Sequence, residues 1–100
     1  MNKGLAFEWC IYHLVSKIYP EKFANDSVAK TAKTNFDSAP EDVKKDAFNA
    51  IQNIESKFGK IIDIEKTSGG GVEPKTDLYI KTKNKELKCS ILNLWGSAKV

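Results

Sequence analysis

Two stretches near the C-terminal end alternate between apolar and polar residues, and this alternation restricts the fold more than any other feature of the sequence. Leu78 and Ile80 take alternate positions in the first stretch, as Leu87, Cys89 and Ile91 do in the second. Neighbouring residues of a strand face opposite sides, so these side chains are predicted to face a core. The sequence therefore predicts an antiparallel hairpin with one buried face.

The other face of this hairpin collects polar side chains. Directly opposed residues of an antiparallel pair share a face, so matching the two apolar sets also matches the remaining residues. The second face is predicted to carry Asp77, Tyr79, Lys81, Glu86, Lys88 and Ser90. Two acids and a lysine on one exposed face can hold a divalent metal ion and a water beside a phosphate.

The distance between the two acids depends on the turn. A tight turn at Lys83-Asn84 places Asp77 opposite Ser90, roughly 13 Å along the strand from Glu86 at about 3.3 Å per residue. That distance is too long for joint ligation of one ion. Asparagine tolerates left-handed backbone geometry, so the sequence favours this tight turn.

Two other turns bring the acids closer. A turn at Thr82-Lys83 places Asp77 opposite Lys88, with Glu86 on the diagonal. A wider loop over residues 80–83 places Asp77 directly opposite Glu86. A shared metal site requires one of these registers or a bulge, and the sequence leaves the register open.

The first half of the chain has helical patterns. Residues from Gly4 to Tyr19 are predicted to form a helix that ends at Pro20. Its apolar residues cover most of the circumference, so the helix is expected to be largely covered by the rest of the fold; they include Leu5, Phe7, Trp9, Ile11, Tyr12, Leu14 and Ile18.

Two more helices and a strand follow. Asp26 or Ser27 can cap a short helix that runs to about Lys33. The sequence Ser38-Ala-Pro-Glu41 resembles a capping box and predicts the start of a third helix, which Gly59 ends. Residues 60–66 then alternate as a strand. We predict one α+β domain over residues 1–100, with N-terminal helices packed on a small antiparallel three-stranded sheet.

The amino-acid composition limits the classes of function that the chain can have. All 16 basic residues are lysines, the net charge is +3, and there is no arginine for bidentate recognition of phosphate or guanine. Cys10 and Cys89 lie in apolar runs, which indicates buried free thiols. The two cysteines are far apart in the sequence and the chain has a single histidine, which argues against a zinc site. No apolar run reaches the roughly 18 residues of a membrane span, and the N-terminus does not fit a signal peptide, so we expect no membrane partner and a cytoplasmic location.

The polar face of the hairpin has a possible catalytic chemistry. In one of the closer registers, Asp77 and Glu86 would bind magnesium, or manganese in its place, because hard divalent cations prefer carboxylates. Lys88 could orient the metal-activated water. Sequence-independent attraction to a phosphate backbone would come from Lys75, Lys81, Lys83 and Lys85. Glycines 69–71 form either a loop that contacts this backbone or a linker between strands.

These residues resemble a known family. The glycine loop, Pro74-x-x-Asp77 and Glu86-x-Lys88 are similar to the signature of the PD-(D/E)XK nuclease superfamily, which has the restriction-endonuclease-like fold. Lys3-Gly4-x-x-x-Glu8 at the start of the first helix resembles archaeal Holliday-junction resolvases and related phage endonucleases. Residues 20–58 would be a helical insertion relative to that family.

The resemblance implies an active site and a reaction. It carries over Glu8, Asp77, Glu86 and Lys88 as catalytic residues, with the three acids as metal ligands and Ser68 beside the DNA. The reaction would be hydrolysis of DNA phosphodiester bonds in a phage or a bacterial host cell. The family core continues with a helix and a strand for which residues 90–100 are too short, so we expect a truncated member, a homo-oligomer or a second chain that completes the core.

The alternative is a module without catalysis. A lysine-rich surface hairpin can bind nucleic acid or protein, with Glu86 and Lys88 as exposed pairs. Glu8 would then be a solvent-facing acid near the positive end of the helix dipole.

Overall fold

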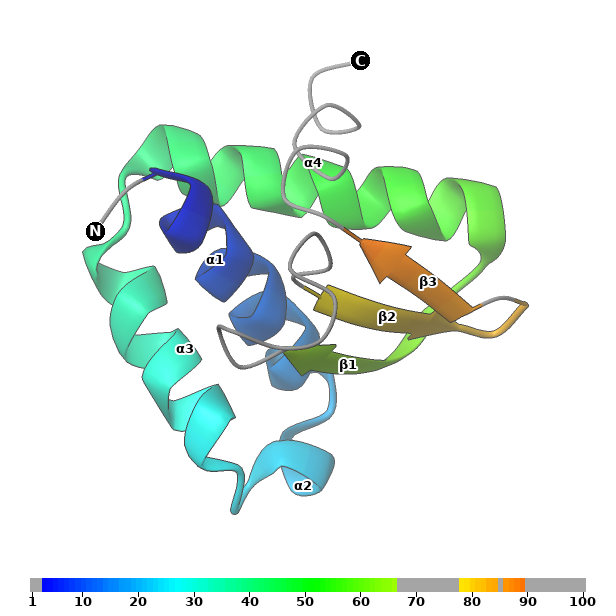
Figure 1. Cartoon of the computed structure of the whole chain (residues 1–100), viewed down its shortest axis with the longest axis horizontal. Helices are drawn as coiled ribbons and strands as arrows, with labels where there is room; N and C mark the ends of the chain where they lie inside the picture. The colour runs from blue at the N-terminus through cyan, green and yellow to red at the C-terminus, as the bar shows by residue number, and fades with distance from the viewer. Residues whose placement is uncertain (1–2, 67–77, 85, 90–100) are drawn as a thin grey trace.

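Helices precede a small antiparallel sheet in the fold. The computed structural model describes the backbone of residues 3–66, 78–84 and 86–89, and the side chains of residues 6–66 and 78–84. The helices are α1 (Lys3–Ile18), α2 (Pro20–Phe23), α3 (Ser27–Ser38) and α4 (Glu41–Phe58). The strands are β1 (Ile61–Lys66), β2 (Leu78–Thr82) and β3 (Glu86–Cys89) (Figure 1). The α+β class predicted from the sequence is confirmed.

Helix α1 lies at the centre of the molecule. It contacts α3, α4 and β1, with α3 on one side and the strands on the other (Figure 1). The side chains of Phe7, Cys10, Ile11 and Val15 are completely buried. The prediction that this helix is covered on most of its circumference is therefore confirmed, and its central place follows from its wide apolar surface.

Helix α4 packs through one face, as its spacing predicts. Val43, Ala47, Ile51 and Ile54 are buried at helical intervals. The helix ends at Gly59, whose φ of 95° is a conformation that residues with a side chain rarely adopt. The predicted glycine stop is confirmed.

The predicted capping box is wrong. Helix α3 continues to Ser38, whose hydroxyl donates a hydrogen bond to the Thr34 carbonyl in the preceding turn. The hydroxyl is therefore used inside α3 and does not cap α4, whose first turn is preceded by Pro40 without a side-chain cap. The sequence fits a capping pattern, but Ser38 is the last residue of α3 and its hydroxyl is bonded within that helix.

Strands β1 and β2 pair antiparallel, with an irregularity between Ile61 and Asp63. Ile61 pairs with Thr82 and Asp63 with Lys81, so Ile62 is the extra residue of a bulge. The bulge lets both Ile61 and Ile64 face the core, although they are three residues apart. Leu78 and Ile80 of β2 are also completely buried, which confirms the predicted core face of that strand.

Helical cover is shown for two antiparallel strands, β1 and β2, and not for the three-stranded sheet that we predicted, since Ile61 and Ile64 of β1 and Leu78 and Ile80 of β2 are buried in the core. The backbone of β3 is hydrogen-bonded to β2 on its far side, in the order β1-β2-β3. The side chains of β3 lie outside the described residues, so the buried face of the sheet is described for β1 and β2. None of the described helices combines the length with the apolar character that a membrane span requires.

Candidate functional site around Glu8

Glu8 is buried in the interior, where acids are seldom found. Its side chain is 5% exposed, and its Oε1 lies 2.8 Å from Nζ of Lys66, whose side chain is 14% exposed. A buried carboxylate is costly unless it is paired and hydrogen-bonded, and Lys66 supplies an opposite charge. The solvent-facing alternative for Glu8 is therefore wrong.

Lys66 connects Glu8 to the sheet. It is the last residue of β1, and its Cα pairs with Leu78, the first residue of β2. Its Nζ also lies 4.6 Å from the centre of the Trp9 ring, within the range of a cation–π contact. The carboxylate of Glu8 is thus held close to the point where β1 ends and β2 begins.

The hairpin has the register of the tight turn. Lys81 pairs with Glu86 and Tyr79 pairs with Lys88. These pairings match the turn at Lys83-Asn84 and exclude the two closer registers over the described strands. The register therefore does not favour the joint ligation of one ion by Asp77 and Glu86.

The remaining predicted site residues fall into two groups. Lys81 and Lys83 are exposed, as expected for lysines that attract phosphate, and the strand positions of Glu86 and Lys88 are described through the backbone alone. The predictions for Ser68, Gly69, Gly70, Gly71, Lys75, Asp77 and Lys85 lie outside the described residues.

A carboxylate such as that of Glu8 suits magnesium or manganese in donor type. Glu8 is the one predicted metal ligand whose side chain is described, and within the described residues no three His, Cys, Asp or Glu side chains gather into a metal-binding group. The Lys66 ammonium lies at hydrogen-bond distance from Oε1. An ion at this carboxylate would therefore have to share it with Lys66.

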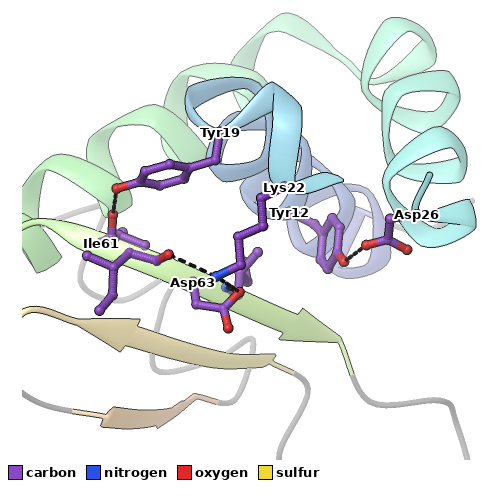
Figure 2. A network of polar contacts seen from close by, with 8 residues as sticks. Tyr12, Tyr19, Lys22, Asp26, Ile61 and Asp63 are labelled. Carbon is purple, nitrogen blue, oxygen red and sulfur yellow. Dashed lines mark hydrogen bonds and ion pairs between the residues drawn. The ribbon is translucent and has the colours of Figure 1, made fainter. Parts of the chain in front are cut away.

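A second polar network joins the helices to β1, and few features of the sequence predicted it (Figure 2). The Tyr19 hydroxyl donates to the Ile61 carbonyl, and Lys22 Nζ lies 3.1 Å from Asp63 Oδ1. Donation to the backbone at Ile61 occurs beside the bulge of β1. The sequence signal was the presence of Tyr12 and Tyr19 in the predicted first helix, which was expected to be largely covered by the rest of the fold.

Tyr12 belongs to the same region. Its hydroxyl donates a hydrogen bond of 2.6 Å to Asp26 Oδ2, while Asp26 Oδ1 accepts from the Val28 backbone N–H and caps α3 (Figure 2). Burial, followed by the hydrogen bond to Asp26, raises the pKa of Tyr12 well above its usual range. The group is therefore a neutral structural donor that fixes α3 against α1.

Cys10 is a buried free thiol, as predicted. Burial raises its pKa to about 11, against a smaller opposing effect of Lys44. Thiolates are the reactive form of cysteine, so this side chain is expected to react slowly at neutral pH.

In a Cys89→Ser variant, Cys10 is expected to react with a disulfide reagent near pH 8 roughly 100-fold more slowly than the unfolded chain, because the thiolate fraction falls about tenfold per pKa unit. Since the folded pKa is raised from 9.0 to about 11, the contribution of the neutral thiol to stability is present below pH 9 and is lost as the pH rises toward 11. Equal rates for the folded and the denaturant-unfolded variant would contradict the burial of this thiol.

Comparison with known proteins does not assign the chain to a family. No protein-family model, no curated protein and no solved structure matches the chain.

Proposed function

We propose that the chain is a metal-dependent DNA endonuclease with a restriction-endonuclease-like core, or one part of such an enzyme. The observation that supports it most is the buried Glu8 carboxylate, which points from α1 to Lys66 at the junction of β1 and β2. A helix whose acid meets the beginning of an antiparallel sheet is the arrangement implied by the resemblance to the PD-(D/E)XK nucleases. An acid turned to solvent would have removed this support.

Each group in the proposed site has a chemical role. Glu8, Asp77 and Glu86 would hold magnesium or manganese, and the bound ion would supply an activated water. Lys88 would neutralise charge on the scissile phosphate. The glycine loop with Ser68 and the lysines of the hairpin would contact the DNA backbone without reading its sequence.

The proposal is tested by incubating the purified protein with supercoiled plasmid and with branched DNA, in the presence of magnesium, manganese or EDTA. We expect nicking with either metal and none with EDTA. Glu8→Gln is expected to slow nicking at least roughly 100-fold, since loss of groups that only support metal ligands already costs 10–100-fold.

Glu41→Gln is the matched control, because Glu41 is an acid on the helical surface with 91% of its side chain exposed. It is expected to nick at the unmodified rate. Nicking in EDTA, or no nicking by the folded protein with either metal, would sink the proposal. Full activity of a folded Glu8→Gln protein would remove Glu8 from the site. Asp77→Asn and Glu86→Gln, compared side by side, would show which of the two acids acts with Glu8.

A second function is a DNA-binding module without catalysis, and the hairpin register favours it. The tight turn is the register that is expected to place Asp77 too far from Glu86 for the two acids to share one ion. In addition, the Glu8 carboxylate is already paired with Lys66. The same assay separates the two functions. Salt-dependent binding of a DNA duplex without any nicking in magnesium or manganese would select the binding module.

A further inference from the structure

A groove of about 520 Å³ lies between α1 and α3 and is bordered by α2. We call it the α1/α3 groove, and α1 separates α3 from the strands (Figure 1). Its volume is in the range of small-molecule sites. Its lining includes His13 and Lys17 of α1, Phe23 of α2, and Lys30, Lys33 and Phe36 of α3. None of them belongs to the Glu8 site.

The rim of the groove is positively charged. Lys17, Lys30 and Lys33 are exposed there against a single carboxylate, that of Asp37. Within the described part of the chain, none of the three ammonium groups forms an ion pair. Three lysines without an ion pair along one concavity favour an anionic ligand.

The interior of the groove is apolar and aromatic. Phe23 and Ala29 are buried beneath it. The His13 ring packs on the Phe36 ring, with 4.5 Å between ring centres and 37° between planes. Burial lowers the pKa of His13, which leaves a neutral aromatic ring at neutral pH. Such a surface suits the flat face of a second ring system.

We propose that the α1/α3 groove binds a nucleotide, with the phosphate at the lysines of the rim and the base against the His13–Phe36 pair. Lysine acts as a point charge for phosphate, and bases stack on aromatic side chains without a need for sequence readout. A free nucleotide and the end of a single strand share this chemistry. The proposal does not depend on the endonuclease function, because the groove and the Glu8 site have no residue in common.

The test is titration of the full chain with AMP, adenosine, ribose 5-phosphate and a short oligothymidylate with a 5′-phosphate, followed by amide chemical shifts. AMP is expected to shift amides of α1 and α3 that line the groove. Adenosine and ribose 5-phosphate are each expected to bind about tenfold more weakly than AMP, because each lacks one of the two contacts. Equal affinity for AMP and either fragment would overturn the proposal, as would shifts confined to the sheet.

The variant Lys30→Gln/Lys33→Gln is expected to weaken AMP binding about tenfold through loss of two ammonium groups. Lys45→Gln/Lys57→Gln is the control with the same change of charge, since both lysines are exposed on α4 and outside the groove. The amide spectrum of each variant also shows that it is folded. Equal weakening in both variants would mean general charge attraction and would overturn the site. Tighter binding of the oligonucleotide at the same amides assigns the groove to a strand end, and equal or weaker binding assigns it to a free nucleotide.

Discussion

Replacing Glu8 with alanine is expected to lower the free energy of unfolding by about 3–5 kcal/mol, the usual cost of leaving a buried charge without its partner. Lys66 is 14% exposed and its Nζ lies 2.8 Å from the removed carboxylate. Without Glu8, this ammonium must be buried uncompensated or pull away from the Trp9 ring. Urea denaturation followed by circular dichroism measures the change.

A double-mutant cycle separates the pair from the packing around it. The variant Glu8→Met/Lys66→Met removes both charges and keeps apolar volume, so it is expected to be more stable than Glu8→Met alone and than Lys66→Met alone. Glu41→Ala is the exposed counterpart, because Glu41 faces Lys44 at 3.4 Å with 91% of its side chain in solvent. Its expected cost is about 0–1 kcal/mol. Similar losses for Glu8→Ala and Glu41→Ala would contradict the buried pair.

This cycle also informs the functional proposal. A variant that abolishes nicking by unfolding the protein says nothing about metal binding. Glu8→Gln keeps the size of the side chain and a hydrogen-bonding oxygen. Its nicking rate must therefore be compared with that of the unmodified protein under conditions in which the variant is folded. If Glu8 serves only to hold Lys66 and Trp9 in place, a folded Glu8→Gln protein nicks DNA at the normal rate.

Replacing Phe7 with alanine is expected to lower the free energy of unfolding by about 3–5 kcal/mol, since Phe7 is completely buried and its loss leaves a cavity at the centre of the core. Helix α1 contacts α3, α4 and β1, so few of the surrounding elements can collapse into that space without breaking other contacts. The midpoint of urea denaturation, at an unchanged slope, reports this loss.

Phe48→Ala is the matched control. Phe48 is also a helical phenylalanine, but 52% of it is exposed on α4. Its replacement is expected to change the stability by about 0.5 kcal/mol or less. Equal costs for the two phenylalanines would mean that α1 is not the centre of the core.

Periodicity was sufficient to predict the elements themselves. The apolar circumference of α1, the single apolar stripe of α4 and the alternation at Leu78 and Ile80 each depend on one period, 3.6 or 2 residues, and all three are confirmed. The end of α4 was predictable for a local reason as well, because the positive φ at Gly59 favours a residue without a side chain.

Competition between neighbouring elements was not predictable in the same way. Ser38 satisfies a capping pattern, yet its hydroxyl bonds to Thr34 within α3. Ile62 fits the strand pattern of β1, yet the bulge leaves it 38% exposed while Ile61 and Ile64 are buried. In both cases two local patterns were possible, and the packing of a whole element selected one of them.

The sequence by itself determined the class of the fold, the order of its three longer helices and its strands, and the face of β2 that is buried, because these follow from the spacing of apolar side chains along the chain. Only the tertiary structure decided that Glu8 is buried against Lys66, and it settled the hairpin register at the turn that Asn84 had favoured without excluding the other two. The physical reason is that an ion pair and a strand register are contacts between distant or freely sliding segments. Their energies depend on which partner the fold brings within reach, and no spacing in the sequence records that choice.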